Sequence, residues 1–314
     1  MILTVTPNPT LDRAVFVRNF RLGTIVRAEK EVLTPSGKGV DASLVLHELG
    51  HPTLATGLVA GHNGRLVVEL LDELGIAHDF VWAAGETRHA LVLVDLAARA
   101  QSTISAPTLR ADERHLQALL DVLGRHLPAA RFVVLAGSLP AGWPADAYVA
   151  LIERCRRAGV PALLDTAGLA LRHGVEAVPE ILKINALELA GLVGLSETSL
   201  AAVVRAATHM RRRMANQAVI VTLGARGAVA VTEGGSWHAL PPRVEAVNDA
   251  GAGDALAGCV AWSRAVGQPW PEALRLGTAA AAAVVTTEGT ACCARATVER
   301  LLPQVQIHAL AVAD

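Results

Sequence analysis

The sequence has few of the residues on which several classes of protein depend. Aromatic residues make up 3% of the 314 residues, with a single tyrosine, so a core must be built from alanine, valine and leucine. The four cysteines show no C-x-x-C spacing, which argues against a disulfide framework or a zinc site. We expect Cys155, Cys259, Cys292 and Cys293 to be buried or half-buried thiols in a reducing compartment.

Long apolar runs and an excess of one charge are also missing. The longest apolar stretch, 279–285, is too short and too rich in alanine to span a bilayer. The first residues lack the basic and apolar regions of a secretory signal. With 28 basic and 29 acidic residues the net charge is −1, whereas nucleic-acid-binding proteins usually carry a basic excess. The sequence therefore predicts a cytoplasmic protein that binds neither nucleic acid nor membranes.

What the chain does contain is 52% hydrophobic residues, arranged in two alternating kinds of segment. Short β-branched runs are typical of strands buried on both faces, and apolar residues at a spacing of three or four between them indicate helices. The predicted strands are 2–6, 54–59, 132–135, 162–164, 181–184, 218–222 and 228–232. The predicted helices are 64–74, 112–123, 145–157, 200–214, 254–265 and 271–286. This order predicts an α/β fold in which helices cover both faces of a mostly parallel sheet.

Two regions, 13–33 and 87–105, break this order because they have strand character without a following helix. Their half-polar pattern predicts a small accessory sheet over one edge of the main domain. Such a sheet is suited to close over a site and exclude water. We therefore expect a single domain over residues 1–314, with a lid formed by about 12–35 and 86–106. A lid with an exposed edge can pair across a two-fold axis, so a homodimer is a further expectation.

Motifs of several other enzyme classes are incomplete. Residues 37–42 fit G-x-G-x-x-A, but they do not follow the first strand of a βαβ unit, as a dinucleotide-binding loop would. The chain has no Walker P-loop and no H-E-x-x-H. Ser138 lacks the second glycine of a G-x-S-x-G elbow. Dehydrogenase, hydrolase and metalloprotease functions are therefore disfavoured.

The strongest motif is Asn-Asp-Ala-Gly-Ala-Gly-Asp at 248–254, which opens a predicted helix of small residues. Gly251 and Gly253 allow a sharp turn and a close approach of a ligand. The free amides at a helix start bind anions. Asp254 lies in the same turn, where a carboxylate can cap the helix or accept a proton from a hydroxyl that receives a phosphoryl group. Both interpretations of Asp254 stay open on these residues alone.

Two shorter motifs also permit a structural and a functional interpretation. Thr222, Gly224 and Gly227 stand between two predicted strands, which fits a tight turn with glycine at positive φ. Asn185 and Glu188 stand three residues apart at a predicted helix start. That spacing fits a capping box, or a site for water-bound Mg²⁺ near phosphates.

Taken together, these motifs and Gly-Lys-Gly at 37–39 resemble those of the ribokinase-like (phosphofructokinase-B type) carbohydrate kinases. The finer resemblance is to the branch with 1-phosphofructokinase and tagatose-6-phosphate kinase, carried by the stretches 6–12, 136–142 and 164–168. The resemblance implies a three-layer ribokinase-like sandwich with a β-sheet lid. It also implies ATP- and Mg²⁺-dependent transfer of the γ-phosphoryl group to a hydroxyl of a ketohexose phosphate. The partner would then be a small sugar or sugar phosphate.

The resemblance further implies a role for each matching residue. Asp254 would be the catalytic base, and the amides of Ala252, Gly253 and Asp254, after Gly251, would form an anion hole. ATP would bind along Lys183, Asn185, Thr222, Gly224 and Gly227, and Asn185 with Glu188 would place Mg²⁺ through water. The acceptor would be held by Asp12, Arg27, Gly37, Lys38, Gly39, Asp41, Arg88 and Ser138. Of these, Lys38, Arg27 and Arg88 would hold the acceptor's own phosphate.

The three cations also have a physical rationale. Lys38 stands between two glycines, so we expect its ammonium on an open loop. Arg27 and Arg88 fall on the predicted lid strands, where a planar guanidinium can clamp a phosphate. Three cations that converge on one point require an anion between them.

Three departures from the family pattern concern the acceptor. Asp41 and Ala90 stand where the branch commonly has Asn, and the stretch 101–108 lacks the usual Glu, Asn and Pro-Gly pair. An ionised Asp accepts hydrogen bonds but cannot donate them. Two alternatives therefore stay open: a kinase of an unphosphorylated sugar or nucleoside, and a non-catalytic ligand-binding homologue.

Overall fold

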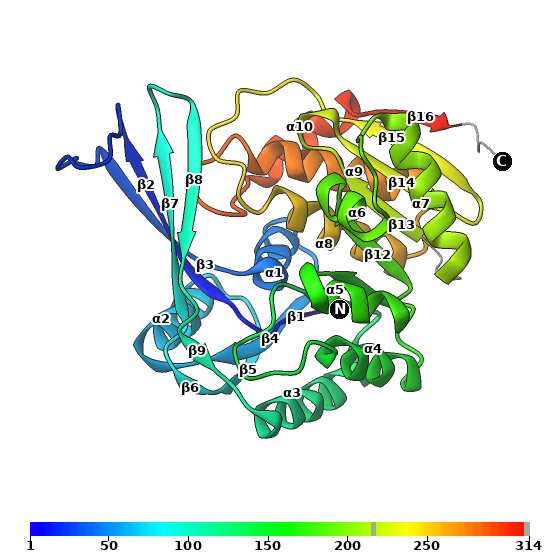
Figure 1. Cartoon of the computed structure of the whole chain (residues 1–314), viewed down its shortest axis with the longest axis horizontal. Helices are drawn as coiled ribbons and strands as arrows, with labels where there is room; N and C mark the ends of the chain where they lie inside the picture. The colour runs from blue at the N-terminus through cyan, green and yellow to red at the C-terminus, as the bar shows by residue number, and fades with distance from the viewer. Residues whose placement is uncertain (215–217, 311–314) are drawn as a thin grey trace.

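Figure 1 shows the computed structural model of the chain, which describes residues 1–214 and 218–310. These residues form a ten-stranded sheet. In sheet order its strands are β16 (Gln306–Leu310), β15 (Gly235–Leu240), β14 (Ala228–Thr232), β13 (Ala218–Thr222), β12 (Ile181–Asn185), β11 (Ala162–Asp165), β10 (Phe132–Ala136), β1 (Ile2–Thr6), β4 (Thr53–Val59) and β5 (His78–Trp82). The strands from β5 to β13 pair in parallel, and β14 to β16 continue that edge antiparallel. The mostly parallel sheet is confirmed.

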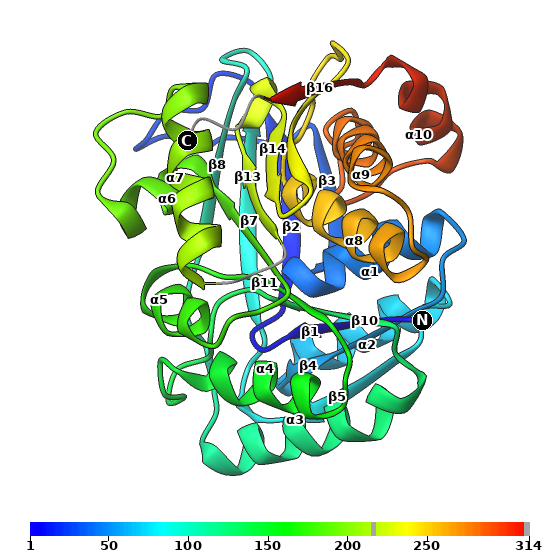
Figure 2. The ribbon, with the colours of Figure 1, turned by 90° about the vertical axis from the view of Figure 1, so that its right-hand side faces the viewer.

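Helices cover both faces of this sheet (Figure 2), and each face has its own cluster of buried apolar side chains. One face carries α1 (Lys38–Glu48), α2 (Gly61–Glu73), α8 (Ala252–Ala265), α9 (Trp270–Val284) and α10 (Arg295–Leu301). The other carries α3 (Glu113–His126), α4 (Ala147–Arg157), α5 (Gly168–Glu176), α6 (Ala186–Val193) and α7 (Leu200–Met214). The predicted three-layer α/β/α sandwich is therefore confirmed. Among the described residues, no helix has the length and apolarity needed to cross a membrane.

A second sheet of four strands projects from one side of the main body in Figure 1. Its order is β3 (Lys30–Ser36), β2 (Thr10–Val17), β7 (Arg88–Asp95) and β8 (Ala100–Ser105). One face packs Ala14, Phe16, Val92 and Val94 together, with Val247 of the main body against them. The predicted accessory sheet is thus present. A two-stranded ribbon of β6 (Ala84–Gly85) and β9 (Leu109–Arg110) lies between β5 and α3 in the chain.

Arg27 does not lie on a strand, contrary to expectation. β2 ends at Val17 and β3 begins at Lys30, so Arg27 is exposed in the loop 18–29. The carboxylate of Asp95 explains why β2 ends there. It accepts the backbone amides of Asn19 at 3.1 Å and Phe20 at 2.7 Å, which turns the chain away from the sheet.

Lys38 does not stand on an open loop either, because it is the first residue of α1. The sequence pattern failed to predict this helix. Every residue from 39 to 46 is buried, so the helix shows no apolar stripe beside a polar one. α1 also packs closely on α8: a Cβ added to Gly258 would stand 3.1 Å from the Cβ of Ala42.

Candidate active site

The carboxyl ends of β11 and β12 lie beside each other in the sheet, as is usual for ligand sites in open parallel sheets. α8 begins near this edge, after a turn that only glycine accommodates easily. Gly251 has φ +84°, and a Cβ on it would stand 2.5 Å from the Cβ of Ala291. No side chain caps this helix, and Asp254 is its third residue. The interpretation of Asp254 as a helix cap is therefore wrong.

The three amides expected to form an anion hole are not equivalent. The amide of Ala252 donates to the carbonyl of Asp249 at 3.3 Å, and that of Asp254 donates to the carbonyl of Gly251 at 3.1 Å. Within the part of the chain that the structure describes, the amide of Gly253 has no carbonyl partner. It is the donor most ready to receive an anion.

Asp254 has the properties of a general base. Its side chain is buried, and burial raises the pKa of Asp254 to about 6, although the nearby ammoniums of Lys183 and Lys38 oppose that rise. A carboxylate with such a pKa is ionised at neutral pH and still basic enough to take a proton from a hydroxyl. The position and the pKa of Asp254 both suit the role that the resemblance implies.

Two lysines meet on one buried carboxylate next to Asp254. Asp165 is the last residue of β11 and is 0% exposed. Its Oδ1 accepts from Lys38 Nζ at 2.5 Å, and its Oδ2 accepts from Lys183 Nζ at 2.5 Å. The side chain of Lys38 is 34% exposed and that of Lys183 is 6% exposed. The structure therefore brings Lys38 to the ends of β11 and β12.

Asn185 and Glu188 form the predicted capping box at the start of α6. Asn185 Oδ1 accepts the amides of Leu187 at 2.9 Å and Glu188 at 2.8 Å, and Glu188 Oε2 accepts the amide of Asn185 at 2.7 Å. One oxygen of Glu188 is left for a ligand. Residues 1–214 and 218–310 hold no cluster of three or more metal-binding side chains. These residues fit Mg²⁺ only in its common form, with water and substrate phosphates as most of its ligands.

Thr222 lies beside Asn185, because the two residues pair where β12 meets β13. Gly227 directly precedes Ala228, which pairs with Thr222 from β14. The segment after β13 is a short 3-10 turn, Gly224–Arg226, closed by a hydrogen bond of 2.8 Å from the Leu223 amide to the Gly227 carbonyl. A Cβ on Gly227 would stand 1.9 Å from the carbonyl oxygen of Ala239. The predicted tight turn is confirmed, and it adjoins the other residues expected to bind ATP.

A group of buried polar atoms without partners marks a different part of the site, at the base of the second sheet. Among the described residues, the buried side-chain atoms with no hydrogen-bond partner include Asn8 Oδ1, Thr10 Oγ1, Asp12 Oδ1, Asp41 Oδ1 and Arg88 Nε. Buried polar groups are normally hydrogen-bonded, and leaving one unpaired costs about 1–3 kcal/mol. Five such atoms in neighbouring residues indicate a place for a ligand with many hydroxyl groups.

Direct contacts join these residues. Arg88 Nη2 donates to the carbonyl of Asn8 at 3.2 Å, and Asn8 Nδ2 donates to Ser138 Oγ at 3.3 Å. Asp12 lies two residues from Thr10 on β2 and accepts from Thr290 Oγ1 at 2.9 Å. Asp12, Arg88 and Ser138 are therefore brought together, as the resemblance implies.

Gly37 and Gly39 allow the start of α1 to pack closely against the end of β1. A Cβ on Gly39 would stand 2.5 Å from Thr6 Oγ1, and that hydroxyl accepts the amide of Val40 at 2.9 Å. A Cβ on Gly37, which has φ +118°, would stand 2.8 Å from Thr6 Cγ2. Both glycines permit the close packing that places Lys38 and Asp41.

The surroundings of Asp41 raise the pKa of its carboxyl. Burial raises its pKa well above the usual range, and the neighbouring carboxyls of Asp254 and Asp12 raise it further. A protonated carboxyl donates one hydrogen bond and accepts others, as an Asn side chain does. The raised pKa therefore favours the form of Asp41 that carries no negative charge.

The three cations expected on one phosphate do not converge. The acidic neighbours of Arg88 are Asp12 and Asp41, whereas Lys38 faces Asp165. Arg27, in the loop 18–29, forms no hydrogen bond or ion pair with any residue that the structure describes. Only Arg88 stays with the acceptor side of the site.

Four residues of the site were missed as candidates. Asn8 and Asp165 lie in stretches that carry the resemblance, so their sequence neighbourhood held a signal. Thr10 lies in the same stretch as Asn8, two residues before Asp12, and therefore held the same signal. Thr290 carries none, because it reaches Asp12 across 278 residues of chain.

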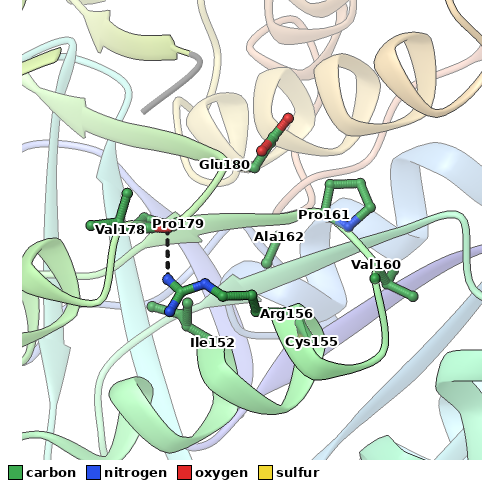
Figure 3. Close-up of a pocket in the computed structure, with 10 residues that line it drawn as sticks. Ile152, Cys155, Arg156, Val160, Pro161, Ala162, Val178, Pro179 and Glu180 are labelled. Carbon is green, nitrogen blue, oxygen red and sulfur yellow. Dashed lines mark hydrogen bonds between the residues drawn. The ribbon is translucent and has the colours of Figure 1, made fainter. Parts of the chain in front are cut away.

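A separate hollow of about 340 Å³ lies at the opposite ends of the strands (Figure 3). Ala162, the first residue of β11, lines it, whereas Asp165 ends that strand in the candidate site. The guanidinium of Arg156 borders the hollow and donates to the carbonyl of Val178 at 3.2 Å. This hollow is not part of the candidate site.

Comparisons with known proteins agree with this geometry. A model of the pfkB family carbohydrate kinases matches residues 9–297. A 1-phosphofructokinase of Vibrio cholerae is 31% identical over 98% of this chain and 97% of its own length. An ATP-dependent 6-phosphofructokinase isozyme 2 of Mycobacterium tuberculosis is 32% identical over 95% of this chain and 88% of its own. The crystal structure of Escherichia coli phosphofructokinase-2 with substrates and products superposes with a TM-score of 0.91, 26% identity, and 96% and 98% of the two chains covered.

Proposed function

This chain belongs to the pfkB family of carbohydrate kinases, and we propose that it transfers the γ-phosphoryl group of ATP to a hydroxyl of a ketohexose phosphate. Two relatives that match nearly the whole chain are named as phosphofructokinases, which supports a phosphosugar acceptor. The observation that carries the proposal is the position of Asp254. It is buried at the start of α8, it caps nothing, and its pKa is raised to about 6 beside two ammoniums.

In the proposed reaction, Asp254 accepts the proton of the acceptor hydroxyl as that oxygen attacks the phosphoryl group. The amide of Gly253 and the ammonium of Lys183 would stabilise the negative charge on the phosphoryl oxygens. Asn185, Glu188 and the turn at Thr222 would hold the nucleotide and Mg²⁺. When bound, Mg²⁺ neutralises charge on the donor phosphates.

The acceptor would lie at the base of the second sheet. The unpaired atoms of Asn8, Thr10, Asp12 and Asp41 supply donors and acceptors for its hydroxyl groups. Arg88 supplies a cation for its phosphate, and Arg88 Nε is itself without a partner among the described atoms. Because the pKa of Asp41 is raised, its side chain has less tendency than an exposed carboxyl to carry a charge that would repel a phosphosugar. We propose that the second sheet acts as a lid over this part of the site.

An unphosphorylated sugar or nucleoside is the alternative acceptor. It is favoured by the isolation of Arg27, which leaves Arg88 as one cation where the resemblance implied three. The non-catalytic alternative is disfavoured, because a buried carboxylate that caps no helix has no structural use at position 254.

The proposal is tested by ADP release from Mg²⁺ and ATP with the purified protein. The acceptors are fructose 1-phosphate, fructose 6-phosphate, tagatose 6-phosphate, free hexoses and pentoses, and common nucleosides. Turnover with one phosphosugar is the expected result. Turnover with unphosphorylated compounds alone would select the alternative, and ATP binding without any turnover would favour the non-catalytic homologue.

A homodimer through the lid belongs to the same proposal, as does a cytoplasmic location. Leu22 is 91% exposed and Ile25 is 99% exposed in the loop 18–29, and Ile104 on β8 is 63% exposed. Exposed apolar side chains of this size are often found at protein interfaces. Sedimentation of the wild type and of Ile25→Asp gives the test, with a dimer expected for the first and a monomer for the second.

A further inference from the structure

The carboxylate of Asp165 contacts two lysines that come from different elements of the fold. Lys38 begins α1, Lys183 lies within β12, and Asp165 ends β11 between them. Each carboxylate oxygen accepts one ammonium at 2.5 Å. Burial alone would raise the pKa of Asp165, but the two lysines hold it below its usual value. The group is therefore an ionised carboxylate between two cations, with one positive charge in excess.

This excess charge faces the start of α8. A Cβ on Gly253 would stand 2.9 Å from Lys183 Nζ, so that ammonium lies directly against the turn with the unpaired amide. The negative groups that hold the pKa of Lys38 above its usual value, against the effect of burial, are Asp165, Asp254 and Glu188. Lys38 thus belongs electrostatically to the phosphoryl-transfer centre and not to the base of the second sheet.

Two cations beside the positive end of a helix repel each other unless an anion joins them. Asp165 offsets one of the two charges and the ionised carboxylate of Asp254 lies near the other. When Asp254 takes the proton of the acceptor hydroxyl, that second charge is available to balance the phosphoryl group. A lysine side chain is long and flexible, so its ammonium is of greatest use when another group fixes it in advance. Asp165 does so for both lysines from a position with no exposed surface of its own.

We propose that Asp165 is a positioning residue that holds Lys38 and Lys183 as a pair on the transferred phosphoryl group. Lys38 then binds the phosphoryl group that is being transferred and not the phosphate already on the acceptor. This inference rests on the proposed kinase function and adds to it a role for Asp165 and a different role for Lys38.

The first test compares Lys38→Met with Arg88→Met, because each variant removes one cation from a different end of the site. Lys38→Met should lower kcat by about 100-fold and change the acceptor KM by less than about threefold. Arg88→Met should raise the acceptor KM by about tenfold or more, with little change in kcat. An acceptor KM that rises in Lys38→Met as it does in Arg88→Met, with kcat retained, would overturn the assignment of Lys38.

The second test uses binding and needs no turnover. Calorimetry gives the dissociation constants of ATP and ADP without acceptor, and only ATP carries the phosphoryl group in question. In Lys38→Met, the dissociation constant of ADP divided by that of ATP should be at least about fivefold smaller than in the wild type. Arg88→Met should leave this ratio unchanged. An unchanged ratio in Lys38→Met would contradict the proposal. If the wild type binds ATP but turns over no acceptor, the proposed function fails while this ratio still tests the lysine pair.

The third test concerns Asp165 itself. Asp165→Glu keeps the charge and moves it by one methylene, so it should fold and bind acceptor with a wild-type KM while kcat falls by about tenfold or more. Asp165→Asn removes the charge. If Lys38 acts through Asp165, the double variant Asp165→Asn/Lys38→Met should have a kcat less than about threefold below that of Asp165→Asn alone. Fully multiplicative losses in the double variant would show that Lys38 acts without Asp165. Circular dichroism establishes folding, and the Asp165→Glu comparison decides the point if Asp165→Asn does not fold.

Discussion

Thr290 Oγ1 donates a hydrogen bond of 2.9 Å to Asp12 Oδ2, although 278 residues separate the two in the chain. The contact ties the loop after α9 to the base of the second sheet. Burial raises the pKa of Asp12, and the hydrogen bond from Thr290 opposes that rise. Thr290 therefore keeps Asp12 available as an acceptor for a substrate hydroxyl.

Thr290→Val keeps the shape of this side chain and removes the hydroxyl. A hydrogen bond of this kind is worth about 0.5–1.5 kcal/mol, so the acceptor KM should rise by about three- to tenfold while kcat changes little. Steady-state kinetics with varied acceptor give the measurement, and Thr290→Ser, which keeps the hydroxyl, is the control. Equal effects of both substitutions would show that the methyl group matters more than the hydrogen bond.

Asp254→Asn should fold and lose most of its turnover. A positioned general base typically contributes about 10²–10⁴-fold to a rate, and an amide cannot take the proton. The melting temperature should stay the same or rise, because an ionised carboxylate buried at this position costs free energy at neutral pH. Turnover is measured by ADP release and stability by calorimetry. A variant with near-normal turnover would remove Asp254 from the role of base.

The pH dependence follows from the pKa of Asp254, which burial raises from 3.8 to about 6. The base acts when ionised, so kcat/KM should fall as the pH decreases through about 6. The effect on stability has the opposite sign. The folded state binds this proton more tightly than the unfolded state, so the contribution of Asp254 to stability decreases as the pH rises from 3.8 to about 6. Initial rates from pH 5 to 8, measured at low acceptor concentration, check the first statement. A profile flat across this range would contradict it.

Gly253→Ala tests the contact between α8 and Lys183. The added Cβ would stand 2.9 Å from Lys183 Nζ, and that ammonium is held by Asp165, so it must move off its position. A displacement on this scale can cost about 100-fold in rate, whereas stability should change little. Gly191→Ala in α6 is the matched control, because its Cβ meets nothing within 4 Å. The control should keep wild-type kinetics and gain about 0.5–1 kcal/mol of stability.

Asp41→Asn should keep activity within about threefold at pH 7.5, because a protonated carboxyl and an amide both donate and accept hydrogen bonds. Asp41→Leu has a similar size but neither ability, and it should raise the acceptor KM by about tenfold or more. Kinetics of the two variants side by side give the comparison. A large loss in Asp41→Asn would mean that the charge of Asp41 is needed.

The sequence predicted those parts of the fold whose pattern is local. The helix 200–214 was predicted with its bounds, since one face is apolar and the other charged. α1 was missed because it is buried on nearly every side and shows no such contrast. Arg27 was misplaced because the break between β2 and β3 depends on hydrogen bonds to Asp95, a residue of β7.

The candidate site also contains residues that local motifs predict and contacts that they do not. Asp254, Asn185 and Glu188 lie within short motifs. Much of their local geometry therefore comes from residues that are close to them in the chain. The pairing of Asp165 with Lys38 and Lys183 joins three separate segments and exists only once the sheet is assembled. The raised pKa of Asp41 likewise depends on burial and on carboxyl groups from α8 and β2. No spacing within the sequence encodes these contacts.

The close approach of Ala42 to Gly258 fixes, from within the dry interior, the separation of the two helix starts that carry Lys38 and Asp254. Ala42 lies four residues after Lys38 in α1 and Gly258 lies four residues after Asp254 in α8, and a Cβ on Gly258 would stand 3.1 Å from the Cβ of Ala42. In the proposed reaction, the hydrophobic core would thus set the separation of Lys38 and Asp254, while residues at the base of the second sheet would select the acceptor. Substitutions on β2, β3 and β7 can therefore retune which compound is accepted without changing the span over which the phosphoryl group travels.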